Sequence, residues 1–73
     1  MKNGRRIEIG HRFMAADLRL APAITAGAWE IVQVFEATDG LLHARLANTV
    51  DRSLIKTVAQ AALLDRNLFR RAD

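Results

Sequence analysis

Two runs of apolar residues with strand-like spacing dominate the hydrophobic pattern of this chain. Residues 29–36 (WEIVQVFE) are rich in β-branched and aromatic side chains, and residues 41–47 (LLHARLA) alternate apolar with polar positions. Both features are typical of β-strands, and Asp39-Gly40 between the two runs is a strong turn signal. The pattern predicts a central hairpin over residues 29–47.

The length of the turn decides which face of this hairpin is buried. A two-residue loop at Asp39-Gly40 pairs Glu36 with His43, whereas a three-residue loop that includes Thr38 pairs Phe35 with His43. The first register buries Trp29, Ile31, Phe35, Leu42, Ala44 and Leu46, and the second buries Val32, Val34, Leu42, Ala44 and Leu46. We favour the first register because it buries two aromatic rings and sets a carboxylate opposite an imidazole.

A weaker alternation precedes the hairpin. In residues 6–13 (RIEIGHRF), Ile7, Ile9 and Phe13 share one phase and the charged residues take the other. This period of two predicts a half-buried first strand, and Gly10 inside it indicates a bulge or bend.

The C-terminal third has two interpretations. A strand over residues 54–59, a helical turn over 61–65 and a short strand over 67–71 fit the β-branched residues that come first and the AALL run that follows. A single amphipathic helix over residues 53–64 fits the same segment, because its apolar residues also recur at helical spacing. The pattern leaves both open.

Length and composition indicate one small domain. The chain has 73 residues, 51% of them hydrophobic, and no cysteine, so it has neither a disulfide nor a cysteine-based zinc site. We expect residues 1–4 to be a disordered tail and residues 5–73 to form one domain. The most apolar stretch, residues 20–28, is far shorter than the ~20 residues of a membrane span. A cytoplasmic protein without membrane contact is expected.

Positive charge gathers at the two ends of the chain. Residues 1–12 carry four cations and one anion (4 − 1 = +3), and residues 66–73 carry three cations and one anion (3 − 1 = +2). Residues 13–65 carry four cations and six anions (4 − 6 = −2), which gives the net charge of +3. Any anionic partner is therefore expected at the termini.

The order of the expected elements resembles that of small SH3-like barrels, of the kind found in short uncharacterised bacterial proteins. The resemblance lies in IGHRF as a first strand, AWEIVQVFEATDG with LLHARLA as the hairpin, and IKTVA with LLDRNLF as the last elements. It implies a mainly β, partly open barrel built round hairpin 29–47 with one helical turn near 61–65. The alternative is an α+β fold, a three-stranded antiparallel sheet with a C-terminal helix 53–64.

In such barrels the first and last strands lie side by side, so the resemblance implies that the two basic clusters meet. The resulting basic edge consists of Arg5, Arg6, Arg12, Arg66, Arg70 and Arg71. Arginine forks bind phosphate or carboxylate groups, so nucleic acid or an acidic protein surface is the expected partner. A lesser candidate cluster consists of Trp29, Phe35, His43 and Arg45, which stack bases or clasp a peptide if that face turns outward. Core packing is the favoured role for the two aromatics.

No pattern of catalytic, cofactor or metal-binding residues stands out. The two histidines, His11 and His43, lie in no ligand spacing such as HxxxH, and we expect His11 to be a partly buried ring with its hydrogen bonds satisfied. The glycines are isolated, and no serine lies in a nucleophile motif. We therefore expect a non-catalytic binding module with no cofactor and no small-molecule substrate. A protein-interaction or homodimeric structural module is the alternative.

Overall fold

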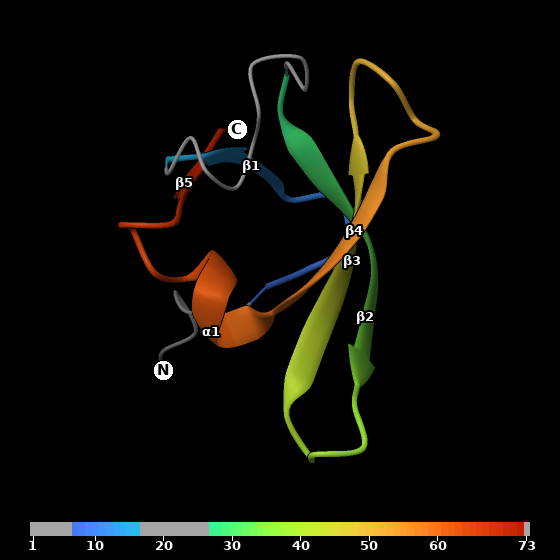
Figure 1. Cartoon of the computed structure of the whole chain (residues 1–73), viewed down its shortest axis with the longest axis vertical. Coiled ribbons are helices and arrows are strands. Elements are labelled where there is room, and N and C mark those ends of the chain that lie inside the picture. Colours follow the sequence, from blue (N-terminus) through green and yellow to red (C-terminus); the bar gives the residue numbers. More distant parts are fainter. Residues whose placement is uncertain (1–6, 17–26, 73) are drawn as a thin grey trace.

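The computed structural model describes residues 7–16 and 27–72, which form one antiparallel sheet and one short helix (Figure 1). The elements are β1 (Arg12–Ala15), β2 (Trp29–Glu36), β3 (Leu42–Asn48), β4 (Ile55–Ala59), α1 (Gln60–Leu63) and β5 (Phe69–Arg71). The sheet is open, with strand order β4-β3-β2-β1-β5. The predicted mainly β fold is confirmed. The expected tail 1–4 lies outside the described residues.

The segment that had two interpretations is a strand followed by a helical turn. Ile55, Thr57 and Val58 favour extended backbone, and β4 pairs with β3 from Ala47↔Ile55 to His43↔Ala59. The helix begins only at Gln60, where the alanines start, and Leu63 in it is 1% exposed. The α+β alternative with a helix over 53–64 is therefore wrong, because residues 55–59 form a strand that is hydrogen-bonded to the edge of β3 opposite β2.

The first strand lies further along the chain than predicted. Gly10 has φ +98°, and the amide of His11 donates to the carbonyl of Glu8 at 3.1 Å, so a turn occupies the expected middle of strand 6–13. β1 begins only at Arg12. Ile7 is buried, but Ile9 in the turn is 67% exposed, so the prediction that the two share a face is wrong.

The register of the central hairpin follows the three-residue loop. Phe35 pairs with His43, the amide of Ala37 donates to the carbonyl of Leu41, and Gly40 closes the loop with φ +82°. The side chain of Asp39 accepts the amide of Leu41 at 2.9 Å. The favoured pairing of Glu36 with His43 is wrong, because a type I turn followed by a left-handed glycine is stabilised by these bonds.

A bulge in β2 changes which residues face the core. Ile31 pairs with Leu46 and Gln33 with Arg45, so Val32 is an extra residue with 41% exposure. Before the bulge the odd residues are buried, as the first register required. After it Val34 packs on the core, as the second required. The expected full burial of Phe35 and Leu42 is wrong, since Phe35 is only half-buried and Leu42 is 43% exposed.

The core lies on one side of the sheet and is closed by the helix. Figure 1 shows α1, β1 and β5 on the same side of the β2–β3 hairpin, whose turn extends beyond the rest of the sheet. The buried apolar residues of this core are Ile7, Phe13, Trp29, Ile31, Ala44, Leu46, Leu63 and Phe69. The opposite side of the sheet has no covering layer among the described residues. It is called the outer face below.

Candidate nucleic-acid interface

The first and last strands lie side by side, as the basic edge required. β1 pairs with β5 through Phe13↔Arg71, Met14↔Arg70 and Ala15↔Phe69. Phe13 and Phe69 are buried, so their neighbours in each strand, Arg12 and Met14 in β1 and Arg70 in β5, point to the outer face. The strand pairing therefore places Arg12 and Arg70 on the outer face of adjacent strands.

The other members of the predicted basic edge do not join this pair. Arg71 lies opposite Phe13 on the core side, and its guanidinium carbon lies 5.7 Å from the centroid of the Phe13 ring. Arg66 lies in the turn between α1 and β5. Arg5 and Arg6 lie outside the described residues. The alternation of β5 separates Arg70 from Arg71, because neighbouring residues of a strand point to opposite faces.

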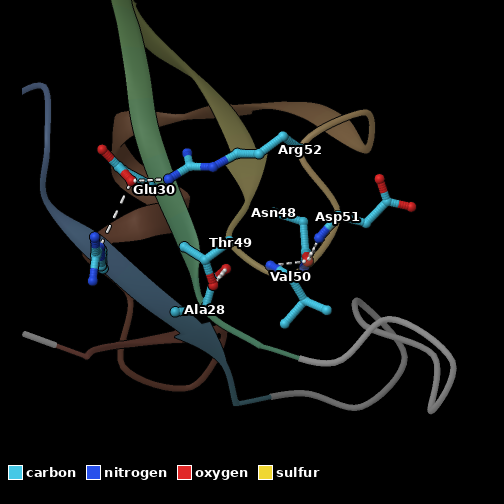
Figure 2. Close-up of polar contacts among 8 residues, drawn as sticks. Ala28, Glu30, Asn48, Thr49, Val50, Asp51 and Arg52 are labelled. Carbon is cyan, nitrogen blue, oxygen red and sulfur yellow. Dashed lines mark hydrogen bonds and ion pairs between the residues drawn. The ribbon is translucent and has the colours of Figure 1, made fainter.

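The carboxylate of Glu30 in β2 forms ion pairs with two arginines on the outer face. Glu30 pairs across the sheet with Arg12, and its Oε1 lies 3.7 Å from Nε of Arg12 and 2.9 Å from Nη2 of Arg52. Figure 2 shows Arg52 reaching from the loop after β3 to Glu30. No sequence signal pointed to Arg52, because only the fold brings this loop beside β2.

The loop that carries Arg52 is fixed by polar side chains (Figure 2). The side chain of Asn48 is buried, and its Oδ1 accepts the amides of Val50 and Asp51, each at 2.9 Å. Thr49 Oγ1 donates to the carbonyl of Ala28 at 2.9 Å. The carboxylate of Asp51 accepts the hydroxyl and the amide of Ser53, and these bonds lower the pKa of Asp51 below its usual 3.8.

The lesser candidate cluster is divided by the sheet. Trp29 is 3% exposed in the core, with the ammonium of Lys56 lying 4.5 Å from the centroid of its ring. Burial lowers the pKa of Lys56. Phe35 is instead on the outer face, because the bulge reverses the orientation of the second half of β2. His43 and Arg45 share this face, because the alternating residues Ala44 and Leu46 of β3 are buried in the core. The expected core role is confirmed for Trp29 and wrong for Phe35.

Phe35 lies against both of the other outer-face members of that cluster. The rings of Phe35 and His43 are stacked, with centroids 5.9 Å apart and planes 26° apart. The guanidinium carbon of Arg45 lies 5.8 Å from the centroid of the Phe35 ring. Nδ1 of His43 lies 3.1 Å from the carbonyl oxygen of Leu41. Because a carbonyl only accepts, this nitrogen is the donor, and the bond fixes the plane of the imidazole.

The strand register joins the two groups of outer-face residues. Glu30 pairs with Ala47 and Gln33 pairs with Arg45, so Arg45 lies one outward position along β3 from the partner of Glu30. We name the outer-face set Arg12, Arg45, Arg52 and Arg70 the arginine band. With Glu30 it carries a net charge of 4 − 1 = +3 on four adjacent elements, β5, β1, β2 and β3 with its following loop.

The described residues also show whether metal ligands, unpaired buried polar atoms and long apolar helices occur. Within residues 7–16 and 27–72, no group of three or more histidine, aspartate or glutamate side chains is placed to hold a metal ion. His11 is partly buried as predicted, but its Nδ1 has no hydrogen-bond partner there, so the expectation of a satisfied ring is wrong. Nε1 of Trp29 likewise has none. In the same ranges, no helix has the length and apolar character of a transmembrane span.

Comparison with known proteins gives no relative. No family model, curated protein or solved structure matches the chain. The resemblance to SH3-like barrels therefore stays a prediction.

Proposed function

We propose that the chain is a non-catalytic binding module that contacts the phosphate backbone of nucleic acid through the arginine band. The observation that carries this proposal is the placement of Arg12, Arg45 and Arg70 on the side of the sheet opposite the core. Guanidinium groups bind phosphate oxygens in a bidentate manner, and neighbouring arginines along a surface match the repeated charges of a polymer better than a single small anion.

Glu30 has a defined part in this proposal. Its carboxylate lies between Arg12 and Arg52 and orients both guanidinium groups, while neutralising only one of the band's four charges. A phosphate that approaches Arg12 and Arg52 has to compete with this carboxylate. Glu30→Gln is therefore expected to strengthen binding of nucleic acid severalfold.

The test is the salt dependence of binding, measured by fluorescence anisotropy with a labelled oligonucleotide between about 50 and 200 mM salt. Four phosphate contacts predict a slope of log K against log salt of about −3. Arg45→Gln is expected to weaken binding and to reduce the slope by about one contact. Arg66→Gln is the matched control, because it removes the same charge from a turn outside the band.

Three results overturn the proposal. The first is no binding at the lower salt concentration, and the second is an equal loss in Arg45→Gln and Arg66→Gln. The third is equally tight binding of polyglutamate, which assigns the surface to acidic proteins instead. Sedimentation of the same samples addresses the homodimeric alternative, since a dimer that dissociates when oligonucleotide binds would show that the outer face is a subunit interface.

A further inference from the structure

The outer face offers more than charge, because its aromatic pair lies beside the arginine band. Phe35 and His43 come from opposite strands of the hairpin and are nearly parallel, with 26° between their planes. Both residues are half-buried, so part of each side chain is accessible. Figure 1 shows that the turn end of the β2–β3 hairpin extends beyond the rest of the sheet.

The orientation of the pair is fixed before any ligand binds. The hydrogen bond from Nδ1 of His43 to the carbonyl of Leu41 holds the imidazole, and cross-strand pairing holds Phe35 beside it. Rings held in this way lose little conformational entropy when a further flat group stacks on them. Arg45 lies beside the Phe35 ring and belongs to the band, so a phosphate contact and an aromatic surface are adjacent.

We infer that the ligand of this face is single-stranded nucleic acid, with a base stacked on the Phe35–His43 pair and the neighbouring phosphates on the arginine band. This inference rests on the proposed function and specifies its substrate class. A duplex presents phosphates but keeps its bases stacked on one another, so it satisfies the arginines and leaves the aromatic pair unused. Stacking also tolerates any base, since every base has a π face.

The discriminating probes carry the same phosphates with and without accessible bases. A labelled oligothymidylate, an abasic oligonucleotide of equal length and a duplex of equal length are titrated with the full chain at fixed low salt. The inference predicts that the oligothymidylate binds about tenfold more tightly than the abasic strand, in line with the energy of stacking one base on an aromatic side chain. The duplex is expected to bind no more tightly than the abasic strand.

Variants of Phe35 connect this preference to the pair. Phe35→Leu keeps an apolar side chain of similar size and is expected to lose the preference for the oligothymidylate over the abasic strand. Phe35→Trp is expected to retain the preference. Ile9→Ala is the matched control, since Ile9 is a 67% exposed apolar residue in the turn before β1. Circular dichroism establishes that each variant is folded.

The outcomes separate this inference from the proposed function. Equal affinity for the three probes, or an unchanged preference in Phe35→Leu, overturns the stacking role and leaves the phosphate contacts of the arginine band in place. Absence of binding to all three probes overturns both. A loss of the preference in Phe35→Leu with its recovery in Phe35→Trp supports the aromatic pair as the site that selects single strands.

Discussion

Removal of the Asn48 side chain tests how the loop that carries Arg52 is held. Asn48 is 1% exposed, and its Oδ1 accepts two backbone amides at 2.9 Å. Asn48→Ala deletes both bonds and leaves the amides of Val50 and Asp51, which are partly buried, without that acceptor. Each lost bond costs about 1 kcal/mol net, and a stranded donor up to about 3 kcal/mol. We expect a loss of about 2–4 kcal/mol.

This loss is large for so small a domain. A chain of this length has a free energy of unfolding of about 4–11 kcal/mol. With a urea m-value of about 1 kcal/mol/M, Asn48→Ala is expected to lower the urea midpoint by about 2 M or more. The melting temperature is expected to fall by about 10 °C or more. Trp29 reports the transition, because it is the single tryptophan and is buried in the core.

A second asparagine provides the control. Asn67 is exposed in the turn before β5. Its backbone amide donates to the side chain of Asp65, and this bond does not involve the Asn67 side chain. Asn67→Ala is expected to change the free energy of unfolding by less than about 0.5 kcal/mol. A change of the same small size in Asn48→Ala would refute the reasoning, since it would mean that water replaces both bonds at no cost.

Two further predictions concern the hairpin turn and acid stability. Gly40→Ala is expected to destabilise the fold by about 1–2 kcal/mol, because φ is +82° there, and Gly40→Asn by less, since asparagine tolerates the left-handed region. Equal urea midpoints for these two variants would contradict that expectation. Because the pKa of Asp51 is lowered below 3.8 in the folded state, its ionised form stabilises the fold above pH 3.8, and this contribution is lost as the pH falls through the folded-state pKa. Urea unfolding at about pH 6 and at about pH 2.5 should therefore show that the difference between the native chain and Asp51→Asn shrinks on acidification. A constant difference would rule this linkage out.

The placement of the elements was largely predictable from local sequence. The hairpin follows from side-chain preferences of a few consecutive residues, whereas residues 54–71 fitted either a strand, a helical turn and a last strand or a helix over 53–64. The pairing of the first and last strands was implied by the resemblance to SH3-like barrels. Gly10 indicated that the first strand is irregular. The left-handed turn at this glycine interrupts the predicted strand instead of bending it.

The candidate site was predictable only in part. Arg12, Arg70, His43 and Arg45 were found from their charge and their strand phase, and the structure places all four on the outer face. Arg52 was missed, because its position depends on a loop held by Asn48 and on a carboxylate in a strand distant in sequence. A local pattern contains no information about such a contact.

The sequence by itself determined the mainly β character and the strands of the central hairpin, because a period of two and β-branched side chains act within a few residues. Only the tertiary structure decided which face each residue occupies. The bulge at Val32 turns Phe35 outward while Trp29 stays in the core, and the alternation of β5 turns Arg70 outward and Arg71 inward. A single extra residue reverses every following side chain, and its place is set by packing against neighbouring strands rather than by the local sequence.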